Sequence, residues 1–393
     1  MKELRTQVAI IGAGPAGLLL GQLLNREGIH NIVLERRSRS YIERRTRAGV
    51  IEFGIANLLE SAGAGERMRS EGLTHHGVEI RVERNAYRIP LSELSDGKSI
   101  TVYGQQEVVK DLIALRINAG AALYFDAAVT SIESLTSDAP VVEFHGADGT
   151  IHVTCDYVAG CDGSFGVANR SIPASVKRHY ERTFPFSWLG ILAEVAPTTE
   201  ELIYCRHDSG FALYSMRSPT LSRLYLGVRP DEKLDTWPDD RIWSELNHRL
   251  ATDEMPEVNQ GPIIERGITA MRSVVIEPMS YGRLFLAGDA AHIVPPTGAK
   301  GMNLALADVR SLAQAFVARL KGNDDALLES YSATCLERVW RAEEFSNYMT
   351  QMLHPNDIDD FENGVQLARL LQLVTTKETA TVLARNYVDL NSL

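Results

Sequence analysis

The chain has 393 residues, of which 45% are hydrophobic, and its formal net charge is −11. A chain of this length exceeds the size at which a single hydrophobic core normally keeps growing, so we expect two domains, or one domain interrupted by another. The acidic balance disfavours binding to nucleic acid or to an anionic membrane surface, because both ligands need a basic protein face.

The first predicted element is a strand that leads directly into a helix. The apolar run 8–11 is followed by glycines at the spacing G-x-G-x-x-G, and a helix is predicted over 17–25. In a dinucleotide-binding turn, Gly12 permits the tight turn, Gly14 lets a pyrophosphate approach the backbone, and Gly17 lets the helix pack closely on the strand. The start of such a helix also offers free N–H groups and a partial positive charge to the diphosphate.

The second predicted strand covers 30–35 and ends in an acid. Glu35 follows Gly12 by 23 residues, which is close to the spacing expected for a carboxylate that binds a ribose hydroxyl. The two strands and the turn together predict a dinucleotide site. A glycine-rich turn with Glu35 as an ordinary surface acid is the alternative interpretation.

The N-terminal segment and the cysteines indicate in which cellular compartment the protein is expected. Lys2 and Arg5 precede the apolar run 8–24 as in a signal peptide, but the embedded glycines and Pro15 would break a signal helix. We therefore expect a soluble, cytoplasmic protein. A disulfide framework or metal site is not expected, because no Cys-x-x-Cys pair or metal-ligand spacing occurs among Cys155, Cys161, Cys205 and Cys335.

The segment 36–49 departs from the acidic balance of the chain. Arginine side chains in such a cluster can bind the 2′-phosphate of NADP, although a solvated charged loop is the alternative. The cluster contains Arg36, Arg37, Arg39, Arg44, Arg45 and Arg47.

Strand patterns of two kinds alternate along the rest of the chain. Buried parallel strands are predicted near 157–163 and 283–290, polar strand-like sequence near 86–99, and an antiparallel sheet within 184–228. From 302 to about 352 the periodicity is helical. The expected fold is mixed α/β: a Rossmann-like dinucleotide-binding domain with a parallel sheet, an antiparallel-sheet substrate domain that interrupts it, and a helical C-terminal region. The expected boundaries are 1–75, 100–180 and 268–320 for the first, 76–99 and 181–267 for the second, and 321–393 for the third.

Two aspartates favour a flavin dinucleotide over nicotinamide alone. Asp162 and Asp289 each follow an apolar strand, and ligands of parallel sheets bind at the carboxyl ends of the strands. An aspartate there can hold a ribityl or ribose hydroxyl. A helix that begins near 295–298 could direct its N–H groups at the flavin ring or the diphosphate. Each aspartate alone is more often part of a turn.

These motifs occur in this order in flavoprotein aromatic hydroxylases, which the chain resembles over nearly its full length. Within that family the similarity is greatest to the hydroxylases of 4-hydroxybenzoate. The resemblance implies FAD, NADPH or NADH, O2 and 4-hydroxybenzoate as participants, oxygen transfer to the 3-position through a flavin C4a-hydroperoxide, and a homodimer. The matching segments are 47–50, 103–105, 159–163, 201–204, 211–213 and 282–301.

The resemblance also implies a substrate pocket. Ser215 and Arg217 are two apart on a predicted strand and so share a face. By resemblance Arg217 binds the benzoate carboxylate, Ser215 and Tyr225 add hydrogen bonds, and Arg223 helps to hold the flavin. Without the resemblance, these side chains would be taken as surface residues of a strand.

A proton path is implied at the other end of the substrate. By resemblance Tyr204 contacts the phenol, Tyr387 is the next member of the relay, and His75 exchanges the proton with solvent, a role for which the ordinary pKa of histidine is suited. The choice of His75 over the adjacent His76 depends on the match alone. The carbonyl of Pro296 is implied to face the substrate hydroxyl. Each of these side chains, taken singly, could equally be a packing residue.

The remaining expectations concern the residues that bind the two nucleotides, FAD and the reduced nicotinamide. Because no second G-x-G-x-x-G exists, the reductant must use a surface groove, for which the resemblance implies Arg36, Arg37, Tyr41, Arg47 and Arg272. Phe165 stands where the family commonly has His, and Asn169-Arg170 displaces an Arg by one position, which leaves NADPH or NADH open. The motifs and the resemblance together imply FAD contacts at Gly12, Gly14, Ala16, Gly17, Glu35, Arg47, Gln105, Asp162, Asp289, Lys300, Asn303 and Arg223.

Three alternatives to this function remain at the level of sequence. The first is a hydroxylase of an amino- or otherwise substituted benzoate, because Tyr204 and Tyr387 define a donor–acceptor chain and not one ring. The second is a flavin-binding protein without turnover. The third, an NAD-dependent dehydrogenase, is disfavoured by the two later aspartate motifs.

Overall fold

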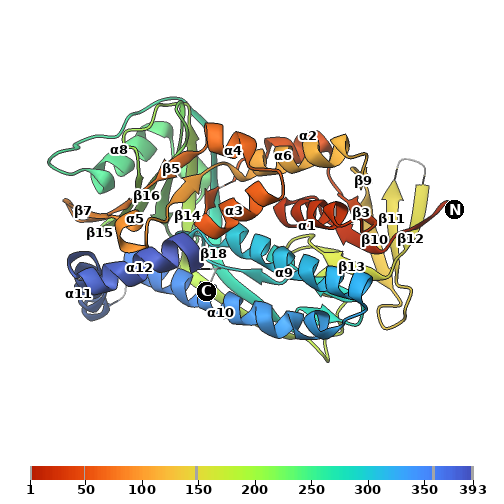
Figure 1. The fold of residues 1–393 in the computed structure, drawn as a ribbon. Coiled ribbons are helices and arrows are strands. Elements are labelled where there is room, and N and C mark those ends of the chain that lie inside the picture. The colour runs from red at the N-terminus through yellow and green to blue at the C-terminus, as the bar shows by residue number, and fades with distance from the viewer. Residues whose placement is uncertain (1, 48, 147–148, 356–358, 391–393) are drawn as a thin grey trace.

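The computed structural model describes residues 2–47, 49–146, 149–355 and 359–390. Its strands form four sheets, and helices cover them (Figure 1). None of the helices in these ranges is both long and apolar enough to span a membrane. The four cysteines are buried and free.

A six-stranded sheet, in the order β19-β20-β13-β2-β3-β9, confirms the predicted parallel sheet. The pairs among β20, β13, β2, β3 and β9 are parallel, and only β19 is antiparallel to its neighbour. Its central strands are buried along their whole length, as expected for a sheet covered on both faces. The strands are β2 (Val8–Ile11), β3 (Asn31–Leu34), β9 (Leu123–Tyr124), β13 (Tyr157–Gly160), β19 (Ser280–Tyr281) and β20 (Leu284–Leu286).

Helix α1 (Pro15–Arg26) follows β2 and begins two residues earlier than predicted. Four of its leucines, Leu18, Leu19, Leu20 and Leu24, are buried, and Leu23 is partly buried. It packs against α6 (Gln105–Asn118) and α9 (Gly301–Gly322), and Figure 1 shows α1 and α9 side by side. The start of α1 therefore lies at the carboxyl edge of the parallel sheet.

An eight-stranded sheet, in the order β21-β18-β14-β17-β16-β15-β6-β7, confirms the predicted antiparallel sheet, with one parallel pair between β15 and β6. Two of its strands, β14 and β18, are long and cross the predicted domain boundaries at 180/181 and 267/268. The polar segment 86–99 forms only part of β7 and the short helix α5 (Leu91–Leu94). The strands are β6 (Val78–Val82), β7 (Asn85–Ile89), β14 (Arg178–Ala193), β15 (Leu202–His207), β16 (Gly210–Ser218), β17 (Leu221–Val228), β18 (Ile263–Glu277) and β21 (His292–Ile293).

Two smaller sheets and several helices complete the part of the chain before α9. The first sheet has the order β1-β12-β11-β10 and the second β4-β8-β5. Helix α8 (Asp239–Leu250) packs against β15 and β16. The other elements are β1 (Lys2–Arg5), β4 (Val50–Ile51), β5 (Leu73–His75), β8 (Ile100–Val102), β10 (Ala128–Glu133), β11 (Val141–Gly146), β12 (Gly149–Thr154), α2 (Arg39–Arg44), α3 (Phe53–Ser61), α4 (Glu66–Glu71) and α7 (Val167–Arg170), with 3-10 turns at Leu234–Thr236, Gly288–Ala290 and Pro296–Gly298.

The predicted C-terminal helical region is confirmed, but it is not continuous. Helix α9 ends at Asn323, whose φ of 55° is left-handed and stops the helix. Helices α10 (Ala326–Leu353), α11 (Asp360–Thr375) and α12 (Lys377–Asp389) follow. Helix α12 packs on α5 and α3, so the last helix of the chain lies near the junction of the two large sheets (Figure 1).

Candidate active site

The glycine-rich turn has the geometry of a phosphate-binding turn. Gly12 has a φ of +101°, and a Cβ atom there would lie 2.3 Å from the carbonyl oxygen of Cys161. A Cβ on Gly17 would lie 1.9 Å from the carbonyl oxygen of Gly12. By contrast, a Cβ on Gly14 would meet no atom within 4 Å. The first and third glycines therefore allow strand and helix to approach, whereas the second faces open space, as the approach of a diphosphate requires.

The start of α1 has free donors and an adjacent carboxylate. Its N-cap is Gly14, and no side chain caps the first turn, which contains Ala16. The buried Glu35 accepts hydrogen bonds from the backbone N–H of Ala13 (2.8 Å) and of Arg37 (2.8 Å). Each carboxylate oxygen retains accepting capacity, so Glu35 supports the turn and is placed for a ribose hydroxyl.

A second carboxylate lies at the end of β13. One oxygen of Asp162 accepts from the backbone N–H of Ala168 at 3.0 Å, while the other is buried and has no hydrogen bond partner among the described residues. Burial raises the pKa of Asp162, and Arg36 is close enough to oppose that rise. An orphaned carboxylate oxygen at this edge fits a ligand hydroxyl. Asp289 follows β20 at the same edge, and its carboxylate lies 3.9 Å from the Arg47 guanidinium.

The segments around Gln105 approach each other closely. A Cβ on Gly49 would lie 1.9 Å from the carbonyl oxygen of Tyr103, and the Tyr103 N–H donates to the Gly49 carbonyl at 2.7 Å. Gln105 is the first residue of α6, whose N-cap Gly104 carries no side-chain hydrogen bond. Gln105 therefore stands at a second uncapped helix start beside the predicted cofactor site.

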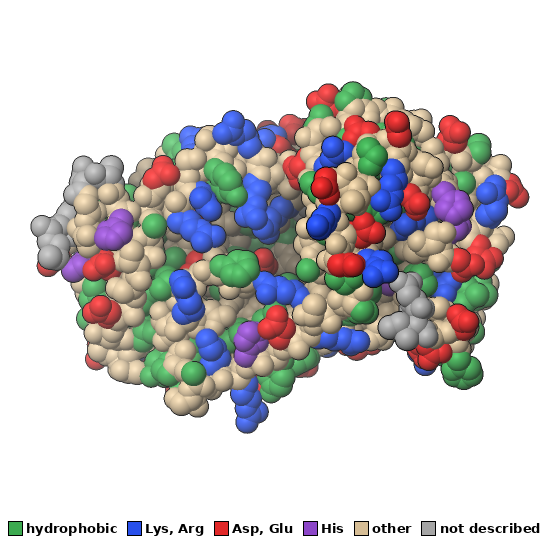
Figure 2. All heavy atoms as spheres, turned by 180° about the vertical axis from the view of Figure 1, so that it is seen from behind, with side chains coloured by type: hydrophobic (Ala, Val, Ile, Leu, Met, Phe, Trp, Pro, Cys, Tyr) green, Lys and Arg blue, Asp and Glu red, His purple; other side chains and the backbone are tan. Residues whose placement is uncertain are grey.

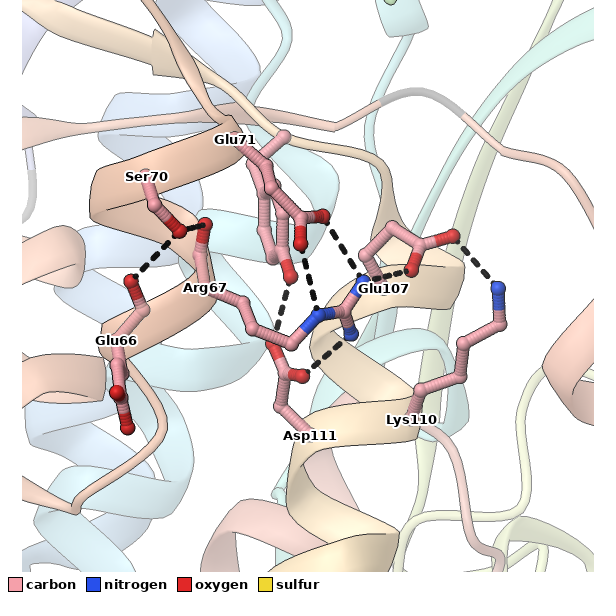
Figure 3. A network of polar contacts seen from close by, with 8 residues as sticks. Glu66, Arg67, Ser70, Glu71, Glu107, Lys110 and Asp111 are labelled. Carbon is pink, nitrogen blue, oxygen red and sulfur yellow. Dashed lines mark hydrogen bonds and ion pairs between the residues drawn. The ribbon is translucent and has the colours of Figure 1, made fainter.

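An ion-pair network anchors that helix (Figure 3). Arg67, on α4, pairs with two acids on α6, and the Tyr103 hydroxyl donates to one of them, Asp111, at 2.7 Å. The network fixes α4 and the 103–105 turn relative to α6. The partners of Arg67 are Glu71 (3.0 Å), Glu107 (2.7 Å) and Asp111 (2.6 Å).

The loop after β21 differs in part from the prediction. Residues Pro296–Gly298 form only a 3-10 turn, and the α-helix begins at Gly301. Lys300 is 1% exposed; its Nζ donates to Glu52 at 2.7 Å and to the Tyr387 carbonyl at 2.9 Å. Burial lowers the pKa of Lys300, and Glu52 partly offsets this. Glu52 is a residue that sequence reasoning missed, because a single acid after a two-residue strand carries no distinguishing pattern.

Asn303 connects the same loop to β4. Its side-chain amide donates to the carbonyls of Val50 and Ala299, both at 2.9 Å, and its oxygen accepts from the Glu52 N–H at 2.9 Å. Asn303 is fully buried. The structure therefore places Lys300 and Asn303 together as supports of the Pro296 loop.

Tyr204 and Tyr387 are brought together. Their hydroxyls are 2.6 Å apart, and both side chains are buried. Tyr204 lies on β15 and Tyr387 on α12, so the pair joins the antiparallel sheet to the last helix. Burial raises the pKa of Tyr204 to about 12 and that of Tyr387 well above its usual value. Both phenols are therefore neutral near pH 7.

Arg217 lies near Tyr204 and Tyr225. Its guanidinium donates to the Ser215 hydroxyl at 2.5 Å and to the Met216 carbonyl at 2.8 Å. Its Nε is shielded from solvent and has no hydrogen bond partner among the described residues. Burial lowers the pKa of Arg217, and Tyr225 and Tyr204 lie close enough to oppose the shift. A shielded guanidinium with an unused donor could bind an anion.

Arg223 is adjacent to this group. It pairs across the sheet with Ser215, its guanidinium contacts Glu265 at 3.1 Å, and it lies 5.2 Å from the centre of the Tyr225 ring. The geometry places Arg223 beside the pocket.

His75 is less accessible than its expected role requires. The ring is 1% exposed, and neither nitrogen has a hydrogen bond partner in the described part of the chain. Burial lowers the pKa of His75 to about 4. His76 is exposed instead, and its Nδ1 lies 2.9 Å from the Ser92 hydroxyl. Exchange of a proton between His75 and solvent therefore requires water to enter.

The residues expected to bind the reductant are exposed. Arg36, Arg37, Tyr41 and Arg47 all lie at the surface, with the Arg37 guanidinium 5.2 Å from the Tyr41 ring. Figure 2 shows Lys and Arg side chains gathered beside a hollow, so positive charge is concentrated locally although the chain is acidic overall.

Phe165 and Arg272 form a second pair, in which Phe165 is exposed and Arg272 is half-buried. The guanidinium of Arg272 lies 5.5 Å from the centre of the Phe165 ring and 3.4 Å from the Ser164 hydroxyl. Phe165 is 73% exposed. Asn169 binds the Lys177 ammonium through its side-chain and backbone oxygens, and Arg170 donates to the Gly166 carbonyl.

Comparison with known proteins places these features in one family. The sequence model of the FAD binding domain matches residues 5–346. The p-hydroxybenzoate hydroxylase of Acinetobacter baylyi is 44% identical over 391 residues, which cover 99% of this chain and 96% of that protein. The Probable NADH-specific resorcinol 4-hydroxylase of Rhodococcus jostii is 24% identical over 348 residues, covering 83% of this chain and 61% of that protein. Among solved structures, p-nitrophenol 4-monooxygenase of Pseudomonas putida shares the fold, with a TM-score of 0.85, 18% identity, and coverage of 100% of this chain and 99% of that one.

Proposed function

This chain belongs to the FAD binding domain family and is a flavin-dependent aromatic hydroxylase, and from that premise we propose that it converts 4-hydroxybenzoate to 3,4-dihydroxybenzoate with O2 and NADPH or NADH. One observation carries the choice of substrate: Arg217, with its shielded and unpartnered Nε, lies close to Tyr204, whose hydroxyl contacts that of Tyr387. A benzoate with a para hydroxyl needs a cation at one end and a proton acceptor at the other.

The carboxylate end is bound by Arg217. Its fork of N–H donors matches the two oxygens of a carboxylate, and such charged hydrogen bonds are the strong ones in a shielded site. Ser215 and Tyr225 orient the guanidinium and add hydroxyl contacts. Because Ser215 is buried and the Nε of Arg217 is shielded from solvent, these contacts favour the anionic end of the substrate.

The phenol end is bound by Tyr204, which accepts the substrate proton and passes its own to Tyr387. The 2.6 Å separation supports such a transfer, and the shift of the Tyr204 pKa to about 12 means that the tyrosine relays a proton without storing negative charge. The Pro296 carbonyl faces the substrate hydroxyl, and His75 exchanges the proton with water that enters the site. A phenolate ring is electron-rich and therefore ready for hydroxylation at the neighbouring carbon.

FAD, when bound, would carry electrons from the reduced nicotinamide to O2, and O2 would supply the oxygen atom that is transferred to the ring. The uncapped start of α1, the open space at Gly14 and the orphaned oxygen of Asp162 fit a dinucleotide. We assign the cofactor to Gly12, Gly14, Ala16, Gly17, Glu35, Arg47, Gln105, Asp162, Asp289, Lys300, Asn303 and Arg223.

The reductant binds in a surface groove formed by Arg36, Arg37, Tyr41, Arg47 and Arg272. Their exposure and local positive charge support a preference for NADPH, whose additional phosphate is anionic. The domain division stated above (1–75, 100–180 and 268–320; 76–99 and 181–267; 321–393) and a homodimer are parts of the same proposal.

The test follows oxidation of the reduced nicotinamide with and without 4-hydroxybenzoate while the product is identified. We expect 4-hydroxybenzoate to accelerate oxidation and to yield 3,4-dihydroxybenzoate. Benzoate is the matched control, because it can engage Arg217 but offers Tyr204 no proton, so it should yield no hydroxylated product. Formation of hydrogen peroxide alone with 4-hydroxybenzoate, or preferential hydroxylation of another substituted benzoate, would overturn the assignment.

A further inference from the structure

The turn that carries Asp289 is held at both ends by one buried carboxylate. Asp308 lies on α9 and is fully buried. Its Oδ2 accepts a hydrogen bond from the backbone N–H of Gly288 at 3.1 Å and lies 2.6 Å from Nε2 of His292. Gly288 and His292 are the residues at the two ends of the turn, so a single oxygen atom spans it.

The residues of the turn are tightly packed, except for Asp289, whose side chain is partly exposed. Gly288 has a φ of +65°, and a Cβ atom there would lie 2.9 Å from the Cβ of Ala305 on α9. Ala290 and Ala291 are buried, and the Ala291 carbonyl accepts from the backbone N–H of Ile276 on β18. The Asp289 side chain is 49% exposed and projects from this otherwise buried turn.

The His292–Asp308 contact becomes an ion pair when His292 is protonated. Burial acts to lower the pKa of His292, but Asp308, Asp289 and Glu343 together raise it. His292 is 2% exposed, so its ring has little access to bulk water and relies on Asp308, whose other carboxylate oxygen lies 3.9 Å from the Arg338 guanidinium. Replacing either His292 or Asp308 leaves a buried polar group of the other without that partner, which costs free energy. The turn should therefore shift when either partner is replaced.

We propose that Asp308 and His292 are positioning residues for FAD, which hold both ends of the turn at 288–292 and so set the direction in which Asp289 meets the cofactor. This inference rests on the proposed contact between Asp289 and FAD. His292 lies in the segment 282–301, one of the segments that carry the resemblance to the flavin family, yet none of the proposed steps uses it. Its contact with Asp308 gives that histidine a role that differs from direct cofactor binding.

The variants are chosen by the reach of their side chains. His292→Gln keeps an N–H donor near the position of Nε2, whereas His292→Asn is too short to reach Asp308. Asp308→Asn keeps the shape of the carboxylate but removes its charge. Tyr331→Phe is the matched control, because it deletes a buried hydrogen bond of 2.7 Å to the Leu286 carbonyl, in the strand just before the turn. This control measures how much the loss of a buried hydrogen bond at that strand changes FAD affinity and thermal stability.

The experiment measures the dissociation constant of FAD from each holoenzyme by the recovery of flavin fluorescence on dilution, with thermal unfolding recorded in parallel. We expect His292→Asn and Asp308→Asn to weaken FAD binding by about 10- to 100-fold, since each loses a charged hydrogen bond. His292→Gln should recover at least part of the affinity. Tyr331→Phe should bind FAD as the native protein does, even where its unfolding temperature falls.

A double variant separates positioning from general destabilisation. If Asp308 acts through Asp289, Asp289→Ala combined with Asp308→Asn should bind FAD no more weakly than Asp289→Ala alone. Effects that multiply, or losses no larger than that of Tyr331→Phe, would overturn the proposal. Unchanged FAD affinity in Asp289→Ala would overturn it as well, and would locate the failure in the proposed FAD contact of Asp289 and not in the role of Asp308.

Discussion

Replacing Tyr204 with Phe tests the proton path at its first step. The change removes one hydroxyl from a buried pair separated by 2.6 Å and leaves the Tyr387 hydroxyl without that partner. An unsatisfied buried hydroxyl costs about 1–3 kcal/mol, so the variant should be less stable by that amount but still folded. Loss of a positioned proton acceptor typically lowers a rate by about 10²- to 10⁴-fold. Hydroxylation should fall within that range, because the substrate would remain a phenol.

Reduction of the flavin does not need the substrate proton to leave, so nicotinamide oxidation should continue in Tyr204→Phe. The assay measures the nicotinamide consumed, the 3,4-dihydroxybenzoate formed and the hydrogen peroxide released in the same sample. Peroxide should replace the hydroxylated product. Tyr214→Phe is the control: Tyr214 is buried on the neighbouring strand β16, and its hydroxyl contacts the backbone of Thr198 and not the relay. Full coupling in Tyr204→Phe would refute the proposed relay.

Three further predictions address the substrate, the reductant and acid stability. Arg217→Lys should raise the dissociation constant of 4-hydroxybenzoate by about 10- to 100-fold, because an ammonium loses the two-pronged contact; a flavin absorbance titration that gives an unchanged constant would remove Arg217 from the pocket. The double variant Arg36→Ala/Arg37→Ala should lower kcat/KM for NADPH more than for NADH. The preference of the native protein for NADPH should shrink as salt is added, because exposed charges are screened over about 8–10 Å. Equal losses of kcat/KM with both nucleotides would contradict a role of these arginines in NADPH binding. Burial lowers the pKa of His354 to about 3, below that of an unfolded histidine near 6.5, so the unfolded state binds the proton first and stability is lost as the pH falls. Between pH 6.5 and 4.5, His354→Gln should reduce the decline in the free energy of unfolding by up to about 1.4 kcal/mol per pH unit; denaturant curves with the same decline in both proteins would argue against this.

Local sequence patterns were sufficient to predict the elements whose formation depends on neighbouring residues in the chain. The apolar runs that become β2, β13 and β20 end in glycine or a Gly-Asp pair, and both the strands and the turn after β2 were predictable from those patterns. The break at Asn323 was missed, because apolar periodicity continues on both sides of it and the left-handed residue is a single asparagine. The extension of β14 and β18 across the expected boundaries was also missed, since strand length there depends on pairing with each other.

The sequence alone therefore determined the dinucleotide turn, the two kinds of sheet and, by resemblance, the family. Only the tertiary structure decided which side chains meet. Tyr204 and Tyr387 are 183 residues apart, and Lys300 and Glu52 are 248 residues apart. No periodicity relates such pairs, because their contact depends on how α12 and the start of α9 pack against distant strands. For the same reason, the exposure of His75 could not be read from its neighbours in the chain: burial is a property of the packed molecule, and it is burial that moves the pKa of that ring to about 4.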